Sequence, residues 1–239
     1  MTEKKGSVLI ASLGDSPGVV TSAIDTLGLA INKVITISTQ GSKTCTKDRK
    51  GTVSKSPGGF VELLINEFEN YPEYNEIEYI YDCIGSSEIE NKSECNEFLT
   101  TAAKYIKEYQ EEGYDVYVCI AGGRKSMSAL LAIAGQFYGA EDIFHIAITK
   151  CDERKYIETN GSSLSLLRGG NRNKLLHPES AEIVSLPFCN LSSFTKSELG
   201  STENEEGARL LDILLKFSEK IKNGIERDIP PNDPTKREL

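Results

Sequence analysis

Two short segments contain residues that could bind and act on a phosphate. Residues 12–18 are Ser-Leu-Gly-Asp-Ser-Pro-Gly, and residues 122–126 are Gly-Gly-Arg-Lys-Ser. Each combines glycine, which lets a backbone approach a ligand closely, with hydroxyl groups and the expected start of a helix, whose free amides favour an anion. Arg124 and Lys125 place two cations in a first helical turn, where they oppose the helix dipole unless an anion lies between them. The two segments therefore predict an anion-binding site.

Neither segment matches a common nucleotide-binding motif. The chain has no G-x-G-x-x-G after its first apolar run and no G-x-x-x-x-G-K-[ST], so it predicts neither a dinucleotide cofactor nor a P-loop NTPase. The only histidines, His145 and His177, are far from H-x-x-H spacing, and the six cysteines include no C-x-x-C pair. We therefore expect no metal, no cofactor and no disulfide framework.

Five apolar runs alternate with helical patterns and must position these segments. The expected strands are residues 7–13, 33–39, 77–84, 115–121 and 142–149. The first helix would begin at Pro17 with Ser16 as its cap. The alternation predicts an α/β fold with a Rossmann-like open, mostly parallel sheet, helices on both faces, and a C-terminal extension with one amphipathic helix.

The expected strand order brings the two segments together. In the order 3-2-1-4-5, strands one and four are neighbours, and ligands bind where the winding direction reverses, at the carboxyl ends of the strands. The loops after strands one and four would then meet. We expect the ends of the second and third strands, at residues 39–42 and 85–87, to line the same site.

The alternation stops after Lys150. We expect residues 1–150 to form the Rossmann domain and residues 151–228 to form an extension packed on that domain. The extension would contain a hairpin or loop up to residue 180, a strand at 181–188 and an amphipathic helix at 205–224. Residues 229–239 are charged and proline-rich, which predicts a disordered tail.

Composition limits the classes of partner. A net charge of −9 argues against a protein that coats long nucleic acid, because that affinity comes from many Lys and Arg contacts to phosphate. No run approaches the roughly 18 apolar residues that would span a membrane. We expect a cytoplasmic protein with neither long nucleic acid nor membrane as a partner, and a small anionic ligand remains compatible with this charge.

Two stretches carry a resemblance to a known family. Residues 8–21 (Val-Leu-Ile-Ala-Ser-Leu-Gly-Asp-Ser-Pro-Gly-Val-Val-Thr) and 119–128 (Cys-Ile-Ala-Gly-Gly-Arg-Lys-Ser-Met-Ser) resemble the CRISPR-associated Rossmann-fold (CARF) family, most of all its stand-alone ring nucleases. The resemblance covers residues 6–150 in motif order; it is specific at 122–128 and looser at 15–21. It implies a homodimer that binds a cyclic oligoadenylate, the second messenger of type III CRISPR systems, across its two-fold axis.

The resemblance also implies site residues. The family's catalytic pair is a serine in the first loop and a lysine in the later glycine-rich loop. Lys125 matches the lysine, while Ser12 and Ser16 both match the serine; we favour Ser16 because it lies at the mouth of the expected helix. The residues expected to bind the ligand are Gly14, Asp15, Pro17, Thr39, Gln40, Gly122, Gly123, Arg124 and Ser126.

The implied reaction needs few groups. A ribose 2′-hydroxyl is already adjacent to its own phosphate, so the protein needs only to hold it in line and to stabilise the charge on the phosphate oxygens. We expect metal-independent cleavage of a cyclic oligoadenylate, with cyclic tetra-adenylate as the first choice. The products would be linear oligoadenylates ending in a 2′,3′-cyclic phosphate, and cleavage would switch off the antiviral signal.

Three alternatives remain open. The same site could sense the messenger without cleaving it and signal through the helix at 205–224, although no effector domain is evident in the sequence. Arg172 and His177 have the R-x-x-x-x-H spacing of HEPN ribonucleases, but those are helical bundles, and we interpret His177 as a turn residue. We interpret His145, within an apolar strand, as a core histidine. The third alternative, a nucleotide-binding metabolic enzyme, is less well supported because the common nucleotide-binding motifs are missing.

Overall fold

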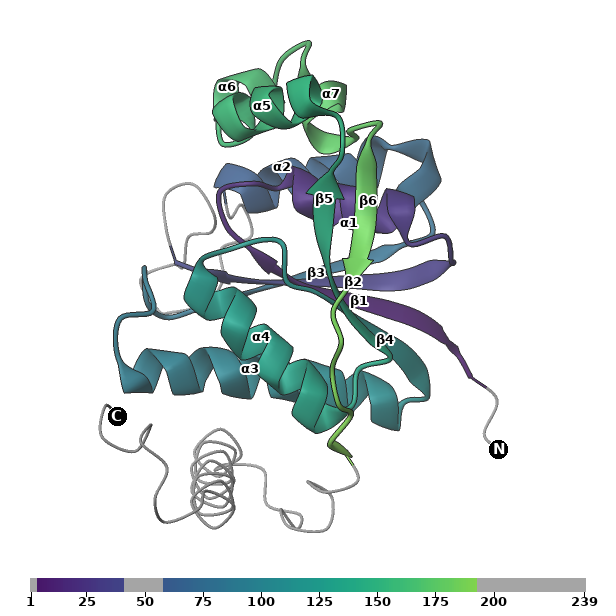
Figure 1. Cartoon of the computed structure of the whole chain (residues 1–239), viewed down its shortest axis with the longest axis vertical. Coiled ribbons are helices and arrows are strands. Elements are labelled where there is room, and N and C mark those ends of the chain that lie inside the picture. Colours follow the sequence, from purple (N-terminus) through teal and green to yellow (C-terminus); the bar gives the residue numbers. More distant parts are fainter. Residues whose placement is uncertain (1–3, 41–57, 193–239) are drawn as a thin grey trace, which may run out of the picture. The chain divides into compact units, whose positions relative to one another are not determined.

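A computed structural model describes residues 4–40 and 58–192 (Figure 1). Its six strands form one sheet in the order β3-β2-β1-β4-β5-β6. The first five strands pair in parallel and β6 pairs antiparallel with β5. The order predicted for the first five strands is confirmed. The strands are β1 (Gly6–Leu13), β2 (Ile31–Thr39), β3 (Glu78–Ile84), β4 (Tyr114–Cys119), β5 (Asp142–Ile148) and β6 (Ala181–Ser185).

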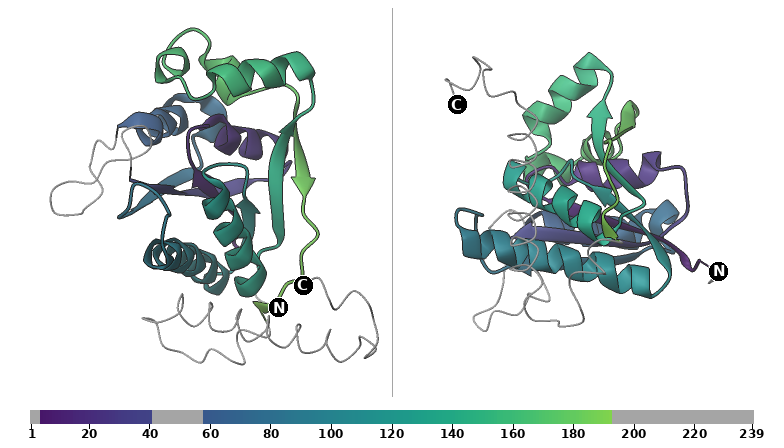
Figure 2. Two further views of the ribbon diagram at one scale, coloured as in Figure 1. Left: turned by 60° about the vertical axis from the view of Figure 1, so that its left-hand side comes forward. Right: turned by 60° about the horizontal axis from the view of Figure 1, so that its bottom comes forward.

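Helices cover both faces of this sheet. Figures 1 and 2 show α1 and α2 on one face and α3 and α4 on the other. This arrangement confirms the Rossmann-like α/β fold. The bounds are α1 (Gly18–Thr26), α2 (Gly59–Asn70), α3 (Lys92–Glu111) and α4 (Lys125–Tyr138), with a short 3-10 turn, η1 (Pro72–Tyr74).

The central strands are buried almost throughout. Residues 8–13 of β1 and 34–39 of β2 are all buried. Parallel strands covered on both faces appear in sequence as continuous apolar runs, which is why these two could be recognised. The edge strand β3 is buried only at its carboxyl end.

The start of α1 differs from the expectation. The helix begins at Gly18 rather than at Pro17, and the Ser16 hydroxyl makes no capping hydrogen bond. The Ser16 and Pro17 carbonyls instead accept bonds from the amides of Val19 and Val20. The backbone turn itself satisfies these amides, so the Ser16 side chain is not used as a cap.

The extension after β5 is helical. The prediction of a hairpin or loop before residue 180 is wrong, because this stretch forms α5 (Cys151–Asn160), α6 (Leu164–Leu167) and α7 (Arg172–Leu176). Leu167, Leu175 and Leu176 are buried against Phe60 and Leu63 of α2. Each helix contributes too few apolar residues to show a helical period in the sequence.

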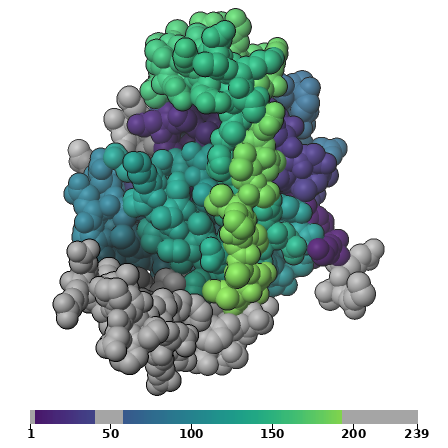
Figure 3. All heavy atoms as spheres, in the orientation of Figure 1, coloured from purple at the N-terminus to yellow at the C-terminus, as the bar shows by residue number. Residues whose placement is uncertain are grey.

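The strand expected at 181–188 is present as β6, although it is shorter. β6 lies along β5 at the surface of the molecule (Figure 3), and Val184 on it is 41% exposed. The expected helix at 205–224, the tail at 229–239 and residues 41 and 42 of the expected site lie outside the described residues. None of the helices that the structure describes is long and apolar enough to cross a membrane.

One cysteine departs from the expectation. Cys83, near the carboxyl end of β3, is disulfide-bonded. The spacing of single cysteines does not show which thiols the fold brings together, so this bond could not be predicted from the sequence.

Candidate functional site

The loops that follow β1 and β4 are in direct backbone contact. The strands are neighbours, and Ala11 pairs with Cys119. A Cβ atom on Gly14 would lie 2.5 Å from the Cα of Gly123, and a Cβ on Gly122 would lie 2.0 Å from the carbonyl oxygen of Ser12. Side-chain atoms do not fit at such distances, so glycine at both positions is what lets the loops touch.

Ser12 fastens the two loops together. Its side chain is fully buried, and its hydroxyl donates a 2.5 Å hydrogen bond to the carbonyl oxygen of Gly122. The Ser128 hydroxyl lies 2.7 Å from the Ile120 carbonyl oxygen and 3.2 Å from that of Gly122, so its single proton favours Ile120. The Ser12 hydroxyl proton is therefore committed to a structural bond between the loops.

Ser16 is in a different situation. It is half-buried between β1 and α1, and no hydrogen bond joins its hydroxyl to any other residue in the described ranges. Asp15 beside it is exposed, whereas Pro17 is buried. Of the two candidate serines, Ser16 is the one whose hydroxyl is available to a ligand.

The two cations at the start of α4 also differ in whether a carboxylate pairs with them. Lys125 is the first residue of the helix and is exposed, and no described carboxylate pairs with it. The Arg124 guanidinium forms an ion pair with Glu88, from the loop between β3 and α3. The sequence did not indicate this partner, which lies 36 positions away.

The first turn of α4 supplies further donors. The amides of Lys125, Ser126 and Met127 have no acceptor among the residues that the structure describes, while the Ser128 amide bonds to the Arg124 carbonyl at 3.1 Å. Unpaired amides of this kind, together with the helix dipole, are a site for an anion. The half-buried Ser126 lies in the same turn.

The ends of β2 and β3 reach the same edge of the sheet. The Gln40 amide donates to the Ser86 carbonyl at 2.7 Å, and the Gly85 amide donates to the Glu97 carboxylate at 2.7 Å. Gln40 is half-buried, whereas Thr39 is only 6% exposed, so its side chain is largely withdrawn from solvent. Four strand ends thus meet around the two loops.

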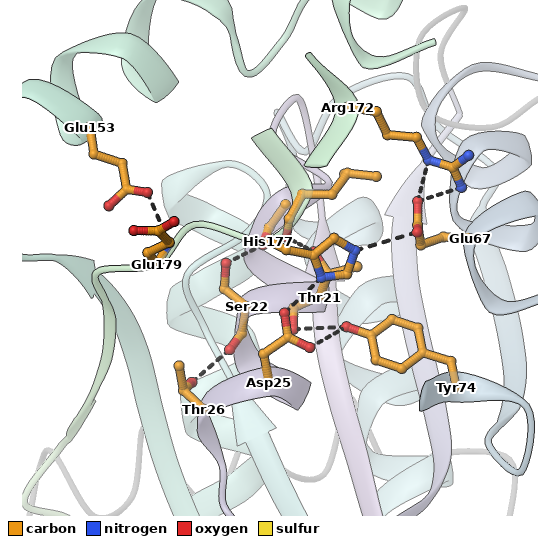
Figure 4. A network of polar contacts seen from close by, with 12 residues as sticks. Thr21, Ser22, Asp25, Thr26, Glu67, Tyr74, Glu153, Arg172, His177 and Glu179 are labelled. Carbon is orange, nitrogen blue, oxygen red and sulfur yellow. Dashed lines mark hydrogen bonds and ion pairs between the residues drawn. The ribbon is translucent and has the colours of Figure 1, made fainter. Parts of the chain in front are cut away.

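Sequence reasoning missed a second polar cluster, which lies between the extension and the sheet-covering helices (Figure 4). Glu67 of α2 is 2% exposed and accepts bonds from Arg172 at 2.5 Å and from His177 Nε2 at 3.3 Å. The other ring nitrogen of His177, Nδ1, lies 2.7 Å from Asp25 of α1. The Tyr74 hydroxyl donates to Asp25 at 2.6 Å. We call these five residues the His177 cluster.

The charges of this cluster reinforce one another. Burial disfavours charged His177, but hydrogen bonds to Asp25 and Glu67 outweigh that cost and raise its pKa to about 9. Burial would raise the pKa of Glu67, yet the bonds from His177 and Arg172 lower it below its usual value. Burial, followed by the contact with Asp25, raises the pKa of Tyr74. The His177 imidazolium and the Glu67 carboxylate are therefore both charged at neutral pH.

This geometry argues against a HEPN-type site. A general acid or base must reach a proton of the substrate, whereas both nitrogens of His177 are held by carboxylates and Arg172 is held by Glu67. As expected, His177 lies in a bend, at the end of α7, but its ring is packed in the cluster and stacks on Tyr71 at 4.2 Å. His145 is half-buried on β5, opposite Val184, rather than a core residue. The spacing of Arg172 and His177 is the part of the cluster that the sequence shows; their partners Asp25 and Glu67 are more than a hundred positions away and leave no local pattern.

Other features of the described residues do not point to a second chemistry. A pocket of about 690 Å³ lies between α5 and α7, and one of about 400 Å³ lies between α2 and α6. Their linings mix cations with carboxylates and do not include the two touching loops. Within residues 4–40 and 58–192, no three His, Cys, Asp or Glu side chains gather in a way that could hold a metal ion.

A family model described as CRISPR-associated protein NE0113 (Cas_NE0113) matches residues 16–217. This match includes the expected serine, the glycine-rich loop and the whole described extension. Among proteins with curated descriptions, none matches this chain.

Three solved structures are similar to this chain at low sequence identity. Csm6 from Enterococcus italicus, bound to cyclic hexa-2′-fluoro-hexa-dAMP, has a TM-score of 0.49 and 10% identity, over 80% of this chain and 44% of that one. Protein VC1899 from Vibrio cholerae has a TM-score of 0.41 and 11% identity, over 58% and 30%. Can2 from Sulfobacillus thermosulfidooxidans, in complex with cyclic tetra-adenylate, has a TM-score of 0.36 and 14% identity, over 58% and 31%. This chain thus spans less than half of each of these proteins.

Proposed function

Because the chain belongs to the CRISPR-associated protein NE0113 family, we propose that it binds a cyclic oligoadenylate at the two touching loops and cleaves it without a metal. The membership, together with the Rossmann-like sheet, confirms the CRISPR-associated Rossmann-fold resemblance. The observation that carries the proposal is the backbone contact between Gly14 and Gly123. That contact brings the Ser16 loop and the amino end of α4 to one edge of the sheet.

The site is suited to phosphate although the chain as a whole is acidic. Within the described residues, the first-turn amides of α4 have no acceptor and Lys125 has no carboxylate partner, which favours a local positive potential in a chain of net charge −9. The protein would therefore bind phosphates at this edge of the sheet, and it would have no extended basic surface for a long nucleic acid. Cyclic tetra-adenylate is the ring we expect it to prefer.

We assign the reaction to the ring's own 2′-hydroxyl. This oxygen attacks the adjacent phosphorus, a 2′-O–P bond forms, and the bond from phosphorus to the 5′-oxygen breaks. The proton lost from the 2′-hydroxyl is balanced by one gained at the departing 5′-oxygen, so no water is consumed. Lys125 and the α4 amides stabilise the charge on the phosphorane, and Ser16 positions the attacking hydroxyl or a phosphate oxygen.

The proposal includes an arrangement of the chain. Residues 1–150 form the ligand-binding domain, and residues 151–228 form an extension packed on it; contacts of α6 and α7 with α2 support this for the described part. Two copies associate about a two-fold axis on which the ring lies, so that each copy presents the same loops. The protein is cytoplasmic and has neither long nucleic acid nor membrane as a partner.

Separation of the reaction products tests the proposal. The purified full chain is incubated with cyclic tri-, tetra- or hexa-adenylate in EDTA, and binding is measured in parallel. Linear products ending in a 2′,3′-cyclic phosphate are the expected result. Tight binding without cleavage of the ring would contradict the nuclease activity and would show that the protein is a sensor of the ring. A chain that neither binds nor cleaves any of the three rings would overturn the proposal.

A further inference from the structure

We infer that Glu88 is an internal competitor for the phosphate site: its carboxylate holds Arg124 in the free protein and gives it up when a ligand phosphate arrives. This inference rests on the proposed function and adds a residue that sets which anions the site accepts. It follows from the ion pair between the two side chains, which joins the β3–α3 loop to the residue before α4.

The backbone around Glu88 is firmly held. On one side, the Gly85 amide donates to the Glu97 carboxylate at 2.7 Å. On the other, the Glu94 carboxylate accepts bonds from the amides of Glu90, at 2.7 Å, and Asn91, at 3.2 Å. Both anchoring carboxylates belong to α3, so the loop that carries Glu88 is fixed at the amino end of that helix.

The Glu88 side chain itself is held only by Arg124. Among the described residues, the carboxylate has no other hydrogen bond or ion pair. It is 43% exposed and the Arg124 side chain is 53% exposed. Ion pairs in such contact with water are weak. A fixed backbone with a weakly held carboxylate is a suitable arrangement for exchange, since the carboxylate can leave and return without moving the loop.

A phosphate of the ring is a stronger partner for Arg124 than this carboxylate. A guanidinium can form two parallel bonds to phosphate, and the neighbouring amides of α4 and Lys125 would bind the same ligand. A small anion that contacts only Arg124 would bind it little more strongly than the Glu88 carboxylate does. Glu88 therefore favours ligands with several phosphates over single ones, and it is placed to take Arg124 back when the cleaved product leaves.

A double-mutant cycle on binding tests this role. Glu88→Gln removes the competing charge and should tighten the binding of cyclic tetra-adenylate by about fivefold, the scale of an exposed ion pair. In an Arg124→Gln background, the same change should have no effect, because there is no cation left to release. Inorganic pyrophosphate is titrated in the same four proteins as a probe that does not depend on the identity of the natural ligand.

The chain offers a matched control. Arg168 and Glu62 form an ion pair at 2.9 Å with exposures of 55% and 42%, and Glu62 lies on α2, outside the proposed site. Glu62→Gln removes one negative charge, as Glu88→Gln does, and should leave both affinities unchanged.

The outcomes separate the inference from the proposed function. If none of the proteins binds the ring, the proposed function fails. The competition is still supported if Glu88→Gln binds pyrophosphate more tightly than the unchanged protein and if this difference is absent in the Arg124→Gln background. Unchanged affinities for both probes in Glu88→Gln overturn the inference. Equal tightening in Glu62→Gln, or in the Arg124→Gln background, also overturns it, because a general charge effect would then explain the result.

Discussion

At the scale of single residues, the two loops divide structural from ligand-facing groups. Ser12 is buried and bonded to Gly122, whereas the Ser16 hydroxyl has no partner among the described residues. Arg124 is paired with Glu88, whereas Lys125 faces solvent without a described carboxylate. Residue type alone does not distinguish one serine from the other, or one cation from the other. The contacts in the folded chain do.

Lys125→Ala should slow chemistry more than it weakens binding. A charge aimed at the phosphorane acts in the transition state, so we expect single-turnover cleavage to fall about a hundredfold while ring affinity falls much less. The variant leaves no carboxylate unpaired among the described residues, so folding should be unaffected. A wild-type rate with weaker binding would show that Lys125 only holds the ligand.

The two serines should separate in a pair of variants. Ser12→Ala removes a buried bond between the loops and should cost about 1 kcal/mol of unfolding free energy, the scale of one neutral hydrogen bond. Ser16→Ala should leave the melting temperature unchanged and slow cleavage. Thermal melts and single-turnover rates measure both effects. Loss of activity without loss of stability in Ser12→Ala, with normal cleavage in Ser16→Ala, would reverse the assignment.

At the scale of elements, the extension is clamped to the helices that cover the sheet. Residues 172–177 contact α1 and α2 through the bonds from Thr21 to the Leu176 carbonyl, from His177 to Asp25 and from Arg172 to Glu67. α1 directly follows the Ser16 loop. The R-x-x-x-x-H spacing is therefore explained by the two side chains converging on Glu67 rather than by catalysis.

The His177 cluster should make stability depend on pH. The pKa of His177 is raised from 6.5 to about 9, so its stabilisation is fully present below about pH 6.5 and is lost as the pH rises through about 9. We expect His177→Gln to lower the free energy of unfolding on the order of 2 kcal/mol at pH 6 and far less at pH 10. Urea unfolding at both pH values measures this. An equal loss at both would mean that packing, not charge, explains the contribution.

The same variant tests the location of catalysis. Below its melting temperature, His177→Gln should cleave the ring at close to the wild-type rate, because both ring nitrogens are already occupied in the cluster. Abolished cleavage by a folded His177→Gln protein, with Lys125→Ala still active, would move the active site to the extension.

The elements differ in how far the sequence could predict them. Buried strands such as β1 and β2 give continuous apolar runs, so the sheet and the meeting of its loops could be predicted. The helices of the extension could not, since they have few buried leucines, which share one small cluster with residues of α2 distant in sequence. Contacts such as Glu67 with His177, 110 positions apart, and Glu88 with Arg124 depend on the folded chain and leave no local pattern.

At the scale of the whole molecule, the candidate site lies at one edge of the sheet, where the ends of β1, β2, β3 and β4 meet. A cyclic ligand with repeated units suits two copies that present this edge to each other. We expect light scattering to give the mass of a dimer of the 26.3 kDa chain. A monomer both with and without cyclic tetra-adenylate would contradict the two-fold site.

The central claim is that the ring is cut by its own 2′-hydroxyl at a metal-free site. Cleavage of cyclic tetra-adenylate in EDTA and in water labelled with oxygen-18 tests it most directly, with mass spectrometry of the earliest products. Because the proposed reaction consumes no water, these products should be linear, should end in a 2′,3′-cyclic phosphate and should contain no oxygen-18. Oxygen-18 in the earliest products, or an intact ring after prolonged incubation with excess protein, would contradict the account.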